Sequence, residues 1–209
     1  MKSVTLSMLL LASAVCAIAA GAARASDPPA VTVKPPVAAQ GVEVLPETKK
    51  QEAVLVGPAT REQIEESSPD WVQAEVESHP DAEAAKALTA VEPGAEVTVF
   101  LGTWCGDSRR EVPRLWRAID EAGGAVPFKI SYVAVDRQKK EPAGAVGESD
   151  IHYVPTFIVH RDGREVGRIV EEAPHGIEHD LADLLTGKAH GVIATRQDVA
   201  PPGGTNPPH

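Results

Sequence analysis

The sequence predicts an α/β domain built on one mixed β-sheet, and two patterns support this fold class. Two β-branched stretches, Glu96–Leu101 (EVTVFL) and Phe128–Val135 (FKISYVAV), lie on either side of a helical segment, Ser108–Glu121. Two further apolar stretches, Thr156–His160 and Glu165–Val170, are joined by an Asp-Gly turn, which favours an antiparallel hairpin. Because a strand-helix-strand unit gives a parallel pair, the hairpin adds antiparallel strands to one mixed sheet, with helices on both faces.

Further helices are predicted before and after this sheet. Thr60–Gln63 fits a capping box, and Ser68-Pro69-Asp70 is typical of a second helix start. Pro80-Asp81 indicates a third start, so the domain has an N-terminal helical extension. Ile177–Leu185 is predicted as the closing helix, because its apolar residues repeat on one face.

The first 25 residues have the three parts of a secretory signal. Lys2 supplies the charge, an apolar run extends from Val4 to about Ala20, and Ala23-Arg24-Ala25 is a small-x-small cleavage site. We therefore expect export to the periplasm or the extracellular space, with the mature chain starting near Ser26. An uncleaved membrane anchor is the alternative, because the apolar run approaches the ~20 residues that span a bilayer.

The segments beside the predicted domain differ from it in composition. Residues 26–58 are rich in Pro, Val and Ala and predict an extended linker. Residues 188–209 are rich in Pro and Gly, and we expect a disordered tail. Residues 59–187 remain as a single folded domain, a size that one hydrophobic core supports.

The net charge argues against two classes of partner, and the cysteine content argues against an internal disulfide. The chain has 20 basic and 30 acidic residues; cleavage removes Lys2 and Arg24 and no acidic residue, which leaves 18 against 30, a net charge of −12. Such a surface repels nucleic acid and anionic lipid. We therefore expect no nucleic-acid partner, and a membrane partner only if the signal segment stays uncleaved. Cleavage also removes Cys16 and leaves Cys105 alone, which excludes an internal disulfide.

The segment around Cys105 resembles the active site of the thioredoxin superfamily. Trp104-Cys105-Gly106-Asp107-Ser108 follows a predicted strand and opens a predicted helix, where the family carries its W-C-x-x-C motif. Pro113 matches the family's helix kink, and Val154-Pro155-Thr156, followed by the hairpin, matches its cis-proline loop. The resemblance covers roughly Glu96–Thr186 and implies a thioredoxin-like mixed sheet. It also implies that Val154-Pro155 is cis and lies with Trp104 beside the sulfur as a substrate-binding surface.

Cys105 is the predicted nucleophile, and two departures from the family define what it can do. Amides at a helix N-terminus stabilise a thiolate, the reactive form of cysteine, and Ser108, one turn on, can donate a hydrogen bond to it. Ser108 stands where the family has its resolving cysteine, and Val99 stands where many thioredoxins bury an acidic residue. Both changes remove the release step of a dithiol cycle and keep the attack step.

Three functions fit these residues. The first, which we favour, is thiol–disulfide exchange through the single nucleophile Cys105, with protein or low-molecular-weight thiols and disulfides as partners. The second is a binding or chaperone-like module without turnover, and the third is a redox sensor in which Cys105 is reversibly capped. No cofactor and no metal site is predicted, because the sequence gives His175, His179 and His190 no ligand geometry with Cys105.

Overall fold

The computed structural model describes residues 54–199, which include the whole predicted domain. The predicted signal segment, most of the predicted linker and the last ten residues of the predicted tail lie outside the described residues. Between residues 54 and 199, none of the helices is both long and apolar enough to cross a bilayer.

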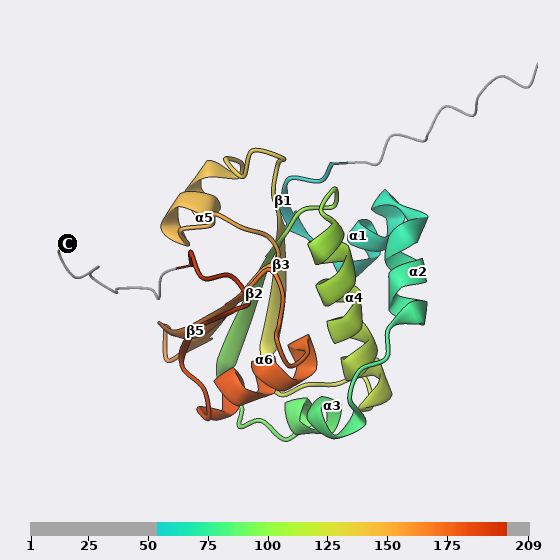
Figure 1. The fold of residues 1–209 in the computed structure, drawn as a ribbon, viewed down its shortest axis with the longest axis vertical. Coiled ribbons are helices and arrows are strands. Elements are labelled where there is room, and N and C mark those ends of the chain that lie inside the picture. The colour runs from blue at the N-terminus through green and yellow to red at the C-terminus, as the bar shows by residue number, and fades with distance from the viewer. Residues whose placement is uncertain (1–53, 200–209) are drawn as a thin grey trace, which may run out of the picture. The chain divides into compact units, whose positions relative to one another are not determined.

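Six strands form one mixed sheet in the order β1-β3-β2-β4-β5-β6 (Figure 1). They are β1 (Gly57–Ala59), β2 (Ala95–Leu101), β3 (Lys129–Ala134), β4 (Thr156–Arg161), β5 (Arg164–Val170) and β6 (Gly191–Ala194). β2 pairs in parallel with β3 and antiparallel with β4, and β4 pairs antiparallel with β5. The predicted parallel pair and the predicted hairpin are confirmed, and β2 is the strand that joins them.

The hairpin turn has the geometry that its sequence predicts. Asp162 and Gly163 are the two residues between β4 and β5, and their φ angles are 53° and 72°. A positive φ at both positions is the conformation of the tight hairpin turns that Asp-Gly favours.

Two edge strands correct the predicted domain boundaries. β1 pairs antiparallel with β3, so Gly57 and Pro58, at the end of the predicted linker, belong to the sheet. β6 pairs in parallel with β5, so the prediction of a disordered tail was wrong for residues 191–194. Both strands are too short to show an alternating pattern, and they form because the open edges of β3 and β5 supply backbone hydrogen-bond partners.

The helices begin close to their predicted caps. They are α1 (Arg61–Ser67), α2 (Pro69–Glu77), α3 (Ala82–Thr89), α4 (Gly106–Glu121), α5 (Ala143–Glu148) and α6 (Ile177–Thr186). Thr60, Ser68 and Asp81 are the N-caps of the first three, and Thr60 forms both hydrogen bonds of its capping box. α4 starts earlier than predicted, directly after Cys105. α5 was not predicted, because its sequence AGAVGE contains two glycines and its N-cap makes no side-chain hydrogen bond.

The helices divide unequally between the two faces of the sheet. Figure 1 shows α1, α2 and α4 grouped on one side of the sheet and α5 on the opposite side, and α4 also contacts α3 and α6. Val97 and Val99 of β2 point into the main core, whereas Phe100 packs in a smaller cluster with Val146 of α5. Helices on both faces are therefore confirmed, but the second face has one short helix.

A buried carboxylate joins three helices of the main layer. Glu178 of α6 is fully buried and accepts two hydrogen bonds from the Arg114 guanidinium of α4, at 2.9 and 2.7 Å. It also accepts the N–H of Asp81, the N-cap of α3, at 2.8 Å. Burial alone raises the pKa of Glu178, but the hydrogen bonds from Arg114 and Asp81 outweigh it and hold that pKa below its ordinary 4.5. The ionised carboxylate therefore stabilises the packing of α3, α4 and α6.

Candidate functional site

Cys105 lies at the junction between β2 and α4. β2 ends at Leu101, a short turn follows, and Cys105 is the N-cap of the 16-residue helix α4. The first turn of a helix has N–H groups without intrahelical partners, and the helix dipole is positive at this end. The residue as a whole is partly exposed.

The loop that leads into β4 lies against this sulfur. The Cys105 thiol donates a hydrogen bond to the Val154 carbonyl, with an Sγ–O distance of 3.2 Å, across 49 positions of sequence. The peptide bond between Val154 and Pro155 is cis, and both residues are buried. A thiolate has no hydrogen to donate. The contact therefore belongs to the thiol form, and ionisation of Cys105 releases the Val154 carbonyl for another donor.

Ser108 has a structural contact that the sequence did not indicate. It is fully buried one turn into α4, and its Oγ accepts a hydrogen bond from the Gly102 N–H at 3.2 Å. This bond joins α4 to the turn that follows β2. A hydroxyl that accepts here still has its own hydrogen to donate, so the hydrogen bond from Ser108 to a Cys105 thiolate stays a prediction.

Trp104, which precedes Cys105, is held by a hydrogen bond and by packing. Its indole N–H donates to the Val135 carbonyl at 3.1 Å, and its ring covers Gly102. A Cβ added at Gly102 would approach the indole to 2.6 Å, so only glycine fits there without moving the ring. Trp104 also packs against the smaller apolar cluster, which contains Val154. The predicted substrate-binding wall is thus part of a hydrophobic core as well.

Two cations lie over the Trp104 ring. The Arg137 Cζ is 5.5 Å and the Lys139 Nζ is 5.9 Å from the ring centroid, within the range of cation–π attraction. Arg137 is exposed and Lys139 is half-buried. The arrangement places positive charge over Trp104, the residue that precedes Cys105.

The loop that carries these cations follows β3 and is closed by Asp136. The Asp136 carboxylate accepts three backbone N–H groups of the same loop. The hydrogen bond from the Glu141 N–H is the largest of the effects that hold the pKa of Asp136 below its usual range. Sequence reasoning missed this loop, although a signal was present: three basic residues fall within residues 137–140 of an acidic chain.

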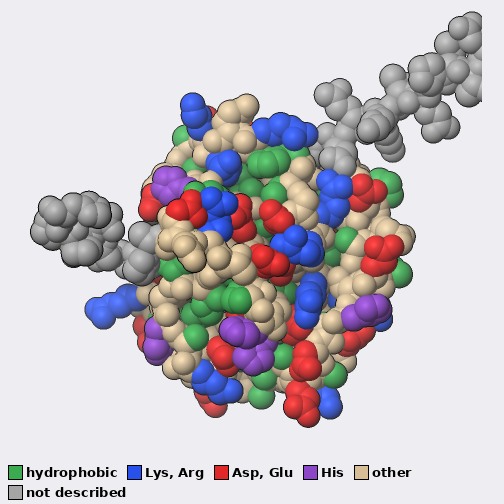
Figure 2. Space-filling view, viewed as in Figure 1, with side chains coloured by type: hydrophobic (Ala, Val, Ile, Leu, Met, Phe, Trp, Pro, Cys, Tyr) green, Lys and Arg blue, Asp and Glu red, His purple; other side chains and the backbone are tan. Residues whose placement is uncertain are grey.

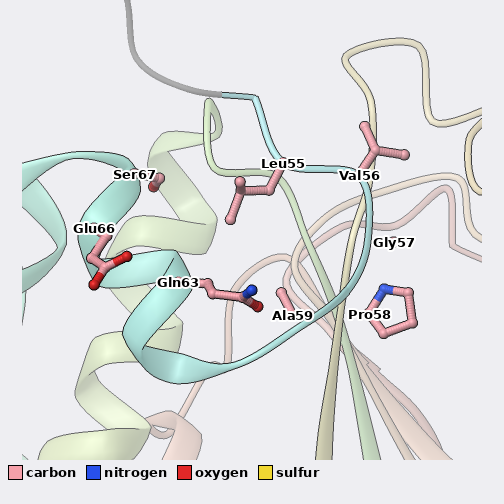
Figure 3. A pocket seen from close by; sticks show the side chains of 8 residues that line it. All are labelled: Leu55, Val56, Gly57, Pro58, Ala59, Gln63, Glu66 and Ser67. Atoms are coloured by element: carbon pink, nitrogen blue, oxygen red, sulfur yellow. The ribbon is translucent and has the colours of Figure 1, made fainter.

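A separate pocket of about 320 Å³ lies between β1 and α1. Figure 3 shows Leu55 and Gln63 pointing into this space. The Leu55 N–H donates to the Thr103 Oγ1 at 3.2 Å, which joins this edge of the sheet to the turn before Cys105. The residues that line the pocket include no cysteine and no histidine.

Comparisons with known proteins find a thioredoxin-like protein and thioredoxins among the relatives of this chain. No protein-family model matches the chain. A thioredoxin-like protein of Acanthamoeba polyphaga mimivirus is 26% identical over 97 residues, which are 46% of this chain and 67% of the relative. The thioredoxin of Staphylococcus aureus is 31% identical over 96 residues, which are 46% of this chain and 83% of the relative. The chain belongs to the thioredoxin superfamily.

Membership of the thioredoxin superfamily confirms the resemblance found in the sequence and supports a redox-type function for the domain. Among solved structures, thioredoxin 2 of Pseudomonas aeruginosa in its reduced form is 22% identical, with a TM-score of 0.33, over 54% of this chain and 94% of that chain.

In this thioredoxin-superfamily domain, the structure brings two of the predicted site residues into direct contact, and two more are their neighbours in sequence. Cys105 contacts Val154 directly, Pro155 follows Val154, and Trp104 precedes Cys105. Ser108 is the fifth, and it lies buried in α4. Their catalytic and binding roles stay predictions. Val99 of β2, which stands where many thioredoxins bury an acid, is fully buried in the main core.

Proposed function

We propose that this thioredoxin-superfamily protein carries out thiol–disulfide exchange through one nucleophile, Cys105. One observation carries the proposal: a partly exposed thiol at the N-terminus of α4 contacts the Val154 carbonyl, and Ser108 stands where a second thiol would be. Protein or low-molecular-weight thiols and disulfides are the proposed partners.

The proposed reaction has two steps. The Cys105 thiolate attacks a disulfide RS–SR′, a bond forms between Cys105 Sγ and one sulfur, and R′S⁻ leaves. A second thiolate, R″S⁻, then attacks the sulfur of the RS group, forms RS–SR″ and returns Cys105 as a thiolate. Electrons balance between the two exchanged disulfides, so no further oxidant is required. Because Ser108 has no sulfur, the second thiol comes from outside the domain.

Accumulation of the mixed disulfide tests this proposal. Reduced protein mixed with a disulfide substrate is expected to gain the mass of one substrate half, measured by intact-mass spectrometry under non-reducing conditions. Added glutathione should remove that mass, and Cys105→Ala should never gain it. If the wild type forms no adduct at any pH up to about 9, where an ordinary thiol is largely ionised, the exchange function fails. The binding or chaperone-like module then takes its place.

The cations on Trp104 predict a preference for anionic disulfides. Positive charge near the nucleophile attracts such substrates, which the net charge of the protein otherwise repels. Replacing Arg137 and Lys139 by glutamate is expected to slow the reaction of Cys105 with the anion dithiobis-nitrobenzoate by about tenfold at low salt. The reaction with the neutral dithiodipyridine should slow by less than about threefold, since no charge attraction is lost. Stopped-flow absorbance measures both rates.

A variant with the same change in net charge controls this comparison. Lys86 at the end of α3 and Lys129 at the start of β3 are exposed. Their replacement by glutamate should slow the anionic probe only slightly and leave the rate of the neutral probe unchanged. The tenfold effect should also vanish at high salt, where exposed charges are screened. An equal loss with both probes in the Arg137 and Lys139 variant would contradict the proposed preference, because the loop would then act on Cys105 itself.

We also propose that the protein is exported and cleaved near Ser26. The proposal rests on residues 1–25, which lie outside the described part of the chain, and an oxidising compartment would supply disulfide substrates. Intact-mass measurement on protein from the native host should give a chain that starts near Ser26. A full-length chain in the membrane fraction would show that the signal segment is an anchor.

A further inference from the structure

The structure brings together three potential metal ligands that the sequence did not associate. His175 precedes α6, and His179 and Asp180 lie in its first turn. One ligand atom from each of the three lies within 4.8 Å of the others, and the two imidazole centroids are 5.7 Å apart. Figure 2 shows a pair of adjoining histidine side chains over α6. Two imidazole nitrogens and a carboxylate oxygen are a donor set that divalent transition metals accept.

The distances within this cluster suit a tetrahedral ion. His175 Nδ1 is 2.9 Å and His179 Nδ1 is 3.8 Å from the same oxygen, Asp180 Oδ1. With metal–ligand distances of about 2.0–2.1 Å, neighbouring ligand atoms of a tetrahedral site are about 3.3 Å apart. The two observed distances differ from this value by about 0.5 Å in opposite directions. Small rotations of the imidazoles would bring both into range.

Asp180 is held in position to act as a ligand. Its side chain is 4% exposed, and its Oδ2 accepts the backbone N–H of His175 at 3.1 Å, which directs Oδ1 toward the imidazoles. Ligating carboxylates in metal sites are commonly fixed by such hydrogen bonds. Between residues 54 and 199, the structure pairs Asp180 with these two histidines and with no lysine or arginine. A buried carboxylate without a permanent cation favours a bound one.

We propose that His175, His179 and Asp180 bind a divalent transition-metal ion of the Zn²⁺ type. Asp183 Oδ2, 3.7 Å from His179 Nδ1, or a water molecule supplies the fourth position. The His175 and His179 side chains are 69% and 51% exposed, so the ion enters directly from solvent. The proposed site does not involve Cys105, because imidazole and carboxylate ligands can bind such an ion without a thiolate.

Calorimetric titration with ZnCl₂ tests the site in untagged, chelator-treated full chain. The Cys105→Ala background is used so that the thiol cannot contribute. We expect one ion per chain, and His175→Gln and His179→Gln should each weaken binding at least about tenfold. His190→Gln removes another exposed histidine and should leave the affinity unchanged. Zn²⁺ should raise the unfolding temperature, relative to the same variant without metal, only where the site is intact.

Three results would overturn the site. The first is a dissociation constant weaker than about 1 mM for Zn²⁺, and the second is an affinity that His175→Gln and His179→Gln leave unchanged. Substitution with Co²⁺ gives a second readout, since nitrogen and oxygen ligands produce visible bands without the near-ultraviolet band of a thiolate ligand. A thiolate band in the wild type that disappears in Cys105→Ala would place the ion at Cys105 and also contradict the proposal.

Discussion

In Ser108→Cys, mixed disulfides on Cys105 are expected to live at least about 100-fold shorter than in the wild type with millimolar glutathione. The new thiol lies one helical turn from Cys105, so its effective concentration at the mixed disulfide is high. The variant should therefore gain insulin-reducing activity in the presence of an external reductant. Val99 leaves the release step without the acid that many thioredoxins bury, so we expect this activity to stay slow. Quenched-flow trapping followed by intact mass measures the lifetime.

Ser108→Ala is the matched control for this result. It removes the oxygen that accepts the Gly102 N–H, which costs about 1 kcal/mol of stability, but it adds no thiol. Its adducts should live as long as those of the wild type. If Ser108→Cys leaves the lifetime unchanged while the protein stays folded, position 108 cannot reach the sulfur of Cys105. The W-C-x-x-C geometry would then be absent.

Arg114→Met is expected to lower the free energy of unfolding by about 2–3 kcal/mol at pH 7. Removal of one partner of a buried ion pair costs about 3–5 kcal/mol, because the other charge stays buried without compensation. The loss is smaller here because the Arg114 side chain is 34% exposed, whereas Glu178 is 0% exposed. Methionine keeps the apolar stem, so the change tests the charge. Chemical denaturation monitored by circular dichroism measures the difference.

The pH dependence of this loss has a definite sign. The folded-state pKa of Glu178 is held below 4.5 against burial by the hydrogen bonds from Arg114 and Asp81. The stabilisation is therefore complete above about pH 4.5 and is lost as the pH falls through the lowered pKa. We expect the gap between wild type and Arg114→Met to be full at pH 7 and to narrow below about pH 4.

Arg117→Met is the matched control on the same helix. Arg117 pairs with Glu121, and their side chains are 42% and 41% exposed, so its replacement should cost no more than about 0.5 kcal/mol. A gap between wild type and Arg114→Met that stays constant from pH 7 to pH 3 would assign the loss to packing and not to the charge of Glu178.

The sequence by itself determined the elements whose signals are local. Thr60 and Asp81 cap helices through contacts with the next few residues, and Asp162-Gly163 adopts the hairpin turn because both residues tolerate a positive φ. The strand before Cys105 and the helix after it are predicted in the same way, and they place the thiol at a helix N-terminus. The position of Cys105 and the serine at position 108 therefore required no tertiary information.

Tertiary structure decided everything that depends on distant partners. β1 and β6 are strands only because the sheet edges pair with them, and the hydrogen bond between Glu178 and the Asp81 N–H spans 97 positions of sequence. The contact of Cys105 with Val154, the cations on Trp104 and the convergence of His175 with Asp180 likewise depend on how loops are folded against neighbouring elements. Local composition sets the chemistry of each side chain, but burial and chain topology decide which side chains meet.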